Sequence, residues 1–319
     1  MRVTRTVREM DAETRGLAYG FLGVLAFSLT LPATRVAVAA FDPTVVGLGR
    51  ALVAAGLAAV LLLLTRQPWP SRPQWRGLVI VAVGVILGFP LLSAWAMSRL
   101  PAAHGAVILG LLPLATALAG ALRAGERPSR GFWVAGVAGS ATVVAFAVSM
   151  GAGDIQPADL ALFAAVLAAA LGYGEGGRLA REMGGWQVIS WALVLAAPFI
   201  AVPVFLALGK PAPVAPWSAW LSFGYVAVVS QFLGFFAWYR GLALGGVARV
   251  SQLQLLQPFL TFLASALLLG EQITLLMLGA ALLVLVTVAL GRKAAISRPA
   301  APPPPGAPVP LAENPPPLR

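Results

Sequence analysis

Residues 184–209 read GGWQVISWALVLAAPFIAVPVFLALG, a run of 26 residues without a charged side chain. A helix that crosses the hydrocarbon core of a bilayer needs about 20 mostly apolar residues, so this stretch is long enough to span a membrane. A second uncharged run covers residues 133–153. The chain is therefore predicted to be an integral membrane protein rather than a soluble protein with a very large core.

The composition of the whole chain supports that prediction and excludes several kinds of chemistry. Of its 319 residues 59% are hydrophobic and 10% charged, whereas soluble proteins carry about 25% charged residues. There is no cysteine and a single histidine, His104, which excludes disulfides, thiolate nucleophiles and cysteine or histidine metal clusters. No cofactor or metal is expected. The net charge of +11 could favour nucleic acid, but no basic run is long enough to form a binding face, so loop arginines are the preferred explanation.

Apolar segments predict about ten transmembrane helices and an all-α membrane fold. An apolar span must satisfy its own backbone hydrogen bonds, which favours helices, and the segments are too long and do not alternate as barrel strands do. The helices are expected at residues 16–39, 43–64, 77–98, 101–122, 131–150, 158–177, 185–208, 217–240, 246–269 and 273–291.

The two ends of the chain differ from the apolar body. Residues 1–15 are charged and are predicted to be a cytoplasmic N-terminal tail. A signal peptide is the alternative, but the apolar run that follows is too long for one. Residues 294–319 are rich in proline and predict a disordered C-terminal tail.

The basic residues predict the orientation of the helices. With the N-terminus inside, 18 of the 22 lysines and arginines fall in inside segments, two in outside loops (Arg99 and Lys210) and two within spans (Arg35 and Arg50). Cytoplasmic loops of membrane proteins carry such an excess. We therefore expect both termini to be cytoplasmic, in a bacterial-type inner (plasma) membrane.

An internal repeat divides the apolar body into two halves. Pro113-x-x-Thr116 is followed by Gly125-Glu126, and Pro258-x-x-Thr261 is followed by Gly270-Glu271, 145 positions later. Upstream, Ala94-Trp95 matches Ala237-Trp238 at an offset of 143. The expected halves are residues 16–150 and 151–293. Each holds five spans, an odd number, so the halves should have opposite orientations, a common transporter design with the binding site between them.

These motifs resemble the drug/metabolite transporter superfamily, and specifically its EamA-type members with ten helices in two related halves. The resemblance covers about residues 16–291, with Phe27 at a position where the family usually has tryptophan. It implies export of solutes, often amino acids or related metabolites. The residues that carry it are Phe27-Ser28 with Arg35, Asp42-Pro43 with Arg50, Ala96 to Ala103, Pro113, Gly125-Glu126-Arg127, Ala248-Arg249-Val250-Ser251, Pro258 and Gly270-Glu271.

Polar and aromatic residues within the spans are candidates for solute binding. On the ninth helix Ser251, Gln254, Pro258, Thr261 and Ser265 are spaced by three and four residues and share one face, flanked by Gln257. The stripe either lines the solute path or joins helices. Gln231, deep in the eighth helix, favours a cavity. The aromatic candidates, which bound the cavity or form an interfacial belt, are Trp95, Trp238 and Tyr173.

Two prolines and four ionisable groups complete the candidate set. Pro113 and Pro258 should kink their helices, either beside the cavity or as packing kinks. Arg35 and Arg50 either attract an anionic group such as a carboxylate or extend to lipid headgroups. Glu175 either couples transport to protons or pairs with Arg178, and His104 is either a ligand or an interfacial residue. Glu126 and Glu271 are expected to cap nearby helix N-termini.

The function that best fits these features is secondary transport, not enzymatic catalysis. A membrane enzyme needs convergent histidine, acidic or cysteine side chains, but this chain has one histidine, no cysteine, and a single aspartate within a predicted span, Asp159 at its edge; no phosphate-binding loop for ATP is present. The expected partners are the lipid bilayer and a small-molecule solute, with a homodimer left open. Export of amino acids or related metabolites by alternating access is preferred over export of drug-like or sugar-derived solutes and over an uncoupled facilitator.

Overall fold

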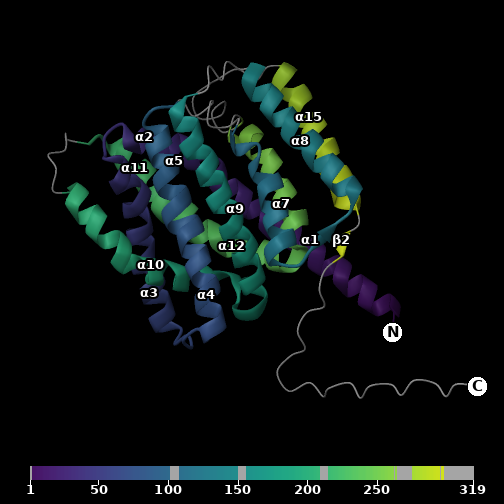
Figure 1. The fold of residues 1–319 in the computed structure, drawn as a ribbon, viewed down its shortest axis with the longest axis horizontal. Coiled ribbons are helices and arrows are strands. Elements are labelled where there is room, and N and C mark those ends of the chain that lie inside the picture. Colours follow the sequence, from purple (N-terminus) through teal and green to yellow (C-terminus); the bar gives the residue numbers. More distant parts are fainter. Residues whose placement is uncertain are drawn as a thin grey trace, which may run out of the picture.

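The computed structural model describes residues 2–100, 108–149, 156–208, 215–261, 263, 275–294 and 296–297, and these form a bundle of helices (Figure 1). Six stretches within them are long and apolar enough to cross a membrane: Asp11–Val38, Val45–Leu64, Arg72–Met97, Pro157–Met183, Gly185–Leu208 and Trp217–Gly245. Three shorter apolar helices are Leu112–Arg123, Arg130–Phe146 and Leu278–Gly291. The all-helical, multi-pass prediction is confirmed. The count of ten stays a prediction, because the ninth predicted span lies partly outside the described residues.

The first five predicted spans correspond, among the described residues, to seven α-helices and two wide π-type turns. They are α1 (Arg2–Ser28) with α2 (Thr30–Val38), η1 (Val45–Gly49) with α3 (Arg50–Leu64), α4 (Arg72–Val81) with η2 (Ala82–Gly88) and α5 (Phe89–Met97), α7 (Leu112–Arg123), and α8 (Arg130–Ser149). Residues 2–15, predicted to be a tail, are helical and continue into α1. The first predicted span, 16–39, is divided into two helices.

The second half of the chain begins with two continuous helices, unlike the first. Its elements are α9 (Pro157–Met183), α10 (Gly185–Leu208), α11 (Trp217–Gly224) with the π-type turn η3 (Tyr225–Leu233) and α12 (Gly234–Gly245), α13 (Val247–Ser251) with the tight 3-10 turn η4 (Gln252–Leu256), and α15 (Leu275–Lys293). Two short strands, β1 (Arg127–Pro128) and β2 (Ile296–Ser297), pair antiparallel.

Glycine pairs bring α1 and α12 into close contact. Gly16 and Gly20 on α1, and Gly241 and Gly245 on α12, are each four residues apart and so lie on one face of their helix. A Cβ atom added to Gly241 would lie 2.6 Å from the Gly20 backbone nitrogen. Small residues at this spacing let membrane helices approach backbone to backbone.

Several other helices pack around α9. This helix contacts α4, α5, α7, α10 and α12 and lies in the middle of the bundle in Figure 1. Helices α8 and α15 pack against each other at one edge of the bundle.

The loops predicted to be inside meet at one end of the bundle. Glu126 pairs with Arg181 at 2.8 Å, and Arg249 pairs with Glu13 and donates to the carbonyl of Ala294 over 3.0 Å. The pairing of β1 with β2 joins the loop after α7 to the segment after α15 at the same end. At the opposite end of the bundle, Arg35 in the last turn of α2 donates to the Met97 carbonyl. These contacts bring several of the predicted inside segments together, and the side of the membrane on which they lie stays a prediction.

Candidate functional site

A proline explains the break between α1 and α2. Pro32 lacks a backbone N–H, so the Ser28 carbonyl, four residues earlier, loses its usual helical partner. The hydroxyl of Thr261 donates a hydrogen bond to this carbonyl, and Gln257 Nε2 donates to the adjacent Phe27 carbonyl over 3.3 Å. Two polar side chains of the ninth predicted span thus satisfy the broken backbone of the first.

Wide turns in three further spans lie next to this break. Arg50 follows η1 directly, Val85 lies in η2, and Ser230 and Gln231 lie in η3. Such turns disturb the regular helical hydrogen-bond ladder and are frequent at functional sites. The Gln231 amide donates to the Val85 carbonyl over 3.2 Å and so connects η3 to η2.

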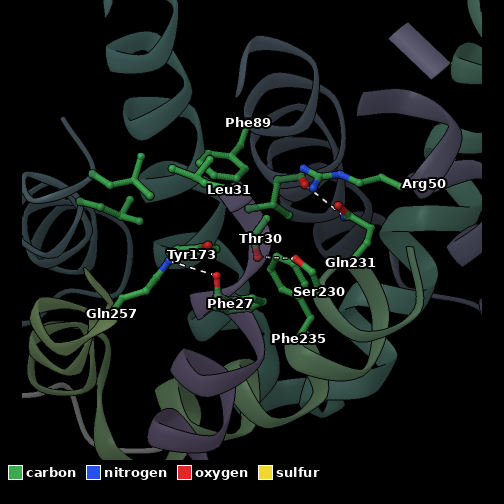
Figure 2. Close-up of a pocket in the computed structure, with 13 residues that line it drawn as sticks. Phe27, Thr30, Leu31, Arg50, Phe89, Tyr173, Ser230, Gln231, Phe235 and Gln257 are labelled. Carbon is green, nitrogen blue, oxygen red and sulfur yellow. Dashed lines mark hydrogen bonds between the residues drawn. The ribbon is translucent and has the colours of Figure 1, made fainter. Parts of the chain in front are cut away.

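A cavity lies where the break and the wide turns meet (Figure 2). Its volume, counted as the space that the centre of a water molecule can reach, is about 20 Å³. That space suits one or two water molecules. The cavity is thus narrow in this conformation. It is lined by Phe27, Thr30, Leu31, Arg50, Val85, Phe89, Leu109, Leu112, Tyr173, Ser230, Gln231, Phe235 and Gln257.

The lining combines neutral polar groups with aromatic rings. The hydroxyls of Thr30 and Ser230 lie 2.8 Å apart and join α2 to η3. The Phe27 and Tyr173 rings are stacked with centroids 6.5 Å apart. The ring of Trp238 lies behind them, 6.0 Å from Phe27 and 5.4 Å from Tyr173. Such a lining offers hydrogen-bond donors and acceptors beside an apolar wall, as small-molecule sites do.

Arg50 is the charged member of the lining. Its side chain is 1% exposed, and Nε and both terminal nitrogens have no hydrogen-bond partner among the described residues. Figure 2 shows its guanidinium turned into the group of lining side chains. Of the two roles predicted for this residue, extension to lipid headgroups does not fit such a buried side chain.

Several of the predicted site residues come together at this cavity. Gln231, Gln257, Tyr173 and Arg50 line it, and Thr261 bonds to Gln257 and to the backbone beside it. Trp238 is fully buried behind the aromatic wall. Both predicted kink positions are helical: the Pro113 carbonyl accepts from the Ser251 hydroxyl over 3.3 Å, and Pro258 follows the lining residue Gln257 directly.

Other predicted residues lie elsewhere. Trp95 is partly exposed and stacks on the Arg99 guanidinium, 4.0 Å from the ring centre. Arg35 is exposed and donates to the Met97 carbonyl. Gln254 is buried but is not among the lining residues. His104, Ser265 and Glu271 lie outside the described residues.

Two hydroxyls in the lining were not predicted from the sequence. Thr30 lies two residues before the proline that breaks the span, and Ser230 directly precedes Gln231. The sequence offered a sign of each: Pro32 frees a backbone carbonyl near Thr30, and the polar Gln231 lies beside Ser230. No local sequence pattern predicts that these two hydroxyls, 200 positions apart, form a hydrogen bond.

Two buried carboxylates lie at the end where the predicted inside loops meet. Glu126 accepts from the backbone N–H groups of Val247, at 2.9 Å, and Ala248, at 2.7 Å, so its predicted capping role is confirmed. Glu175 pairs with Arg123 at 2.9 Å and with Arg178 at 2.7 Å. The local ion pair predicted for Glu175 is present.

Comparison with known proteins identifies the family. The sequence pattern of the EamA-like transporter family matches the chain twice, over residues 14–148 and 156–291. A protein of Bacillus subtilis (strain 168) described as "Uncharacterized transporter YdeK" is 44% identical over 291 residues, which cover 89% of this chain and 99% of that protein. A solved structure titled "Crystal structure of protein" has a TM-score of 0.72 at 19% identity, over 87% of this chain and 98% of its own, and so shares the fold. The chain therefore belongs to the EamA-like transporter family and is a multi-pass membrane transporter.

Proposed function

We propose that this transporter exports amino acids or related small metabolites, and that the cavity between its two family repeats binds the solute. The observation that carries the proposal is the lining, which draws residues from both repeats. Phe27 to Leu112 belong to the first matched stretch, and Tyr173 to Gln257 belong to the second. A site between two repeats suits alternating access, in which the repeats move against each other around a bound solute.

The chemistry of the cavity supports a small polar solute with an apolar part. Amides and hydroxyls both donate and accept hydrogen bonds without the cost of burying a net charge. Gln231 and Gln257 supply amides, and Thr30 and Ser230 supply hydroxyls. The rings of Phe27, Tyr173 and Phe235 supply an apolar wall.

The narrowness of the cavity supports a conformational cycle. An amino acid is larger than the one or two water molecules for which the cavity has room, so the helices around it must separate for a solute to enter. Glu126 in the first repeat holds Arg181 and the start of α13 in the second. Release of these contacts would open the bundle at that end, and we propose that this end is cytoplasmic.

The proposed orientation places both termini in the cytoplasm of a bacterial-type inner membrane, with the two halves inverted. It is supported by the 18-to-2 division of loop lysines and arginines and by the grouping of the loops at two ends. Reporter domains fused after Lys210 and after Gly245 should lie on opposite sides, and signals from the same side would contradict the proposed topology.

Counterflow in proteoliposomes tests the transport proposal. Vesicles loaded with one unlabelled solute are placed in a trace of the same labelled solute, for a panel of amino acids, sugar derivatives and drug-like cations. We expect labelled amino acids to accumulate transiently, and the Gln257→Leu variant to accumulate them at least tenfold more slowly because a cavity amide is lost.

Controls separate this proposal from its alternatives. Gln254→Leu, four residues along the face from Pro258 and outside the lining, should retain transport. Accumulation of sugar derivatives or drug-like cations instead of amino acids would contradict the proposed substrate class. Accumulation that persists without any response to a proton or sodium gradient would indicate a facilitator.

A further inference from the structure

The guanidinium of Arg50 is buried without a counter-charge among the described residues. It is the first residue of α3 and one of the largest fully buried side chains described, at 1% exposure. Arginine stays protonated in proteins, so its burial places a full positive charge in the cavity wall. A buried charge is costly unless it is paired and hydrogen-bonded.

The lining itself does not supply the missing partner. Of the thirteen residues around the cavity none is an aspartate or a glutamate. The buried carboxylates Glu126 and Glu175 are at the inner end of the bundle and hold other arginines. In the part of the chain that the structure describes, Arg50 nitrogens also find no carbonyl or hydroxyl partner.

Arg35, the other arginine within a span, shows what a satisfied guanidinium looks like in this protein. It lies at the exposed end of α2 and donates to the Met97 carbonyl. The two arginines are 15 positions apart in the sequence, yet Arg35 is exposed and hydrogen-bonded while Arg50 is buried and has no hydrogen-bond partner among the described residues.

We propose that Arg50 binds the carboxylate of the transported solute and so restricts the substrates to small molecules with one carboxylate. This inference rests on the proposed function, because it assigns the substrate class of the same cavity. A planar guanidinium matches a carboxylate with two parallel hydrogen bonds. The bound carboxylate supplies the counter-charge that the lining lacks.

The neighbours of Arg50 define the rest of the solute. Gln231, Tyr173 and the Thr30–Ser230 pair are uncharged, so they accept polar groups but offer no second cation. A solute with two negative charges would leave one of them buried and unpaired. Amino acids and simple monocarboxylic acids fit the site, whereas dicarboxylates and phosphate esters do not.

Binding measurements on three forms of the same compounds test the inference. The full chain is purified, and its melting temperature is measured with alanine, leucine, phenylalanine, threonine and glutamine, with their primary amides, and with the matching acids that lack the amino group. The same compounds compete in the counterflow assay. Compounds with a carboxylate should raise the melting temperature and compete, and the primary amides should not.

Variants at the two arginines assign the effect to one residue. Arg50→Gln should bind the acids about 10- to 100-fold more weakly and lose the preference for acid over amide, because a charge-assisted pair is removed. Arg50→Lys should keep part of the preference, since the charge remains without the planar fork. Arg35→Gln is the matched control and should bind as the unaltered chain does.

A stability measurement separates a binding role from a structural one. Without solute, Arg50→Gln and Arg50→Met should melt at or above the temperature of the unaltered chain, because an unpaired buried charge is removed. A lower melting temperature in both would show that Arg50 makes stabilising contacts and would overturn the inference.

The remaining outcomes distinguish the inference from the proposed function. Amides that bind as well as acids, or unchanged affinity in Arg50→Gln, would overturn the carboxylate assignment and leave amino-acid transport in place. If neither acids nor amides bind to any form of the protein or compete in the counterflow assay, the proposed substrate class fails together with the inference.

Discussion

The end of the bundle that holds Glu126 and Glu175 and the central cavity accommodate buried charge in opposite ways. At that end Glu126 and Glu175 are each 1% exposed, and each is held by arginines or backbone N–H groups. In the cavity Arg50 is buried to the same extent without a partner among the described residues. Two kinds of charged group are therefore equally buried but differ in whether the fold supplies a partner.

The difference teaches how to interpret polar groups in an apolar protein. A satisfied buried charge has its partners in the fold and contributes to one arrangement of the helices. An unsatisfied buried charge costs free energy in the solute-free protein. A bound solute of opposite charge removes that cost, which strengthens its binding. Three further predictions test this division, from the largest expected effect to the smallest.

Loss of the Glu126 carboxylate should have the largest effect on stability. Glu126→Leu leaves Arg181 and the N–H groups of Val247 and Ala248 without their acceptor. We expect the free energy of unfolding in mixed micelles to fall by about 3–5 kcal/mol, as for other broken buried pairs. Denaturant titration measures the loss.

The exposed pair between Glu182 and Arg178 provides the control for Glu126. Glu182→Gln breaks an i, i+4 contact on the surface of α9 and should change stability by about 0–1 kcal/mol. An equal loss in the two variants would show that burial does not distinguish the two pairs, and the comparison would fail.

Glu175→Gln should have an intermediate effect. Its partners Arg123 and Arg178 are 40% and 33% exposed, so water can solvate them after the carboxylate is lost. We expect a loss of about 1–3 kcal/mol, and unchanged response of solute exchange to a pH gradient. Exchange that no longer responds to pH in a fully stable variant would instead identify Glu175 as a coupling carboxylate.

Apart from the surface control at Glu182, the hydroxyl pair in the cavity should give the smallest effect. Thr30→Val and Ser230→Ala each remove one member of a neutral hydrogen bond, worth about 1 kcal/mol. A double-mutant cycle in melting experiments should give a coupling energy of similar size, because the two side chains contact each other directly. Additive effects would show that the pair does not join α2 to η3 energetically.

The general architecture was predictable from the sequence because a bilayer imposes simple rules. Long uncharged runs fix the class, and the loop arginines group the loops into two sets. The interruptions of the helices were harder to predict. Pro32 predicts the break after Ser28. The π-type turns η1, η2 and η3 depend on tertiary packing and have no clear local sequence signature. The helical start of α1 within the predicted tail was also missed.

The cavity was partly predictable for a related reason. Gln231 and Gln257 stand out because an amide is costly in an apolar span, and both line the cavity. Sequence spacing places residues on a helix face but does not choose which face meets which neighbour. For this reason Gln254, on the same predicted stripe, lies outside the lining, and Trp95 stacks on Arg99 instead of bounding the cavity.

The wide turns η2 and η3 begin 143 positions apart, at Ala82 and Tyr225, which is the offset that relates Ala94-Trp95 to Ala237-Trp238. Two independent insertions at the same place are less economical than one, so the simplest history is that a single ancestral repeat already carried the turn before the gene duplicated. Divergence then made the copies unequal. Leu87 and Gly88 stand in the first copy where Ser230 and Gln231 stand in the second. The corresponding positions of the two matched repeats thus differ in polarity, and Ser230 and Gln231 of the second repeat line the cavity.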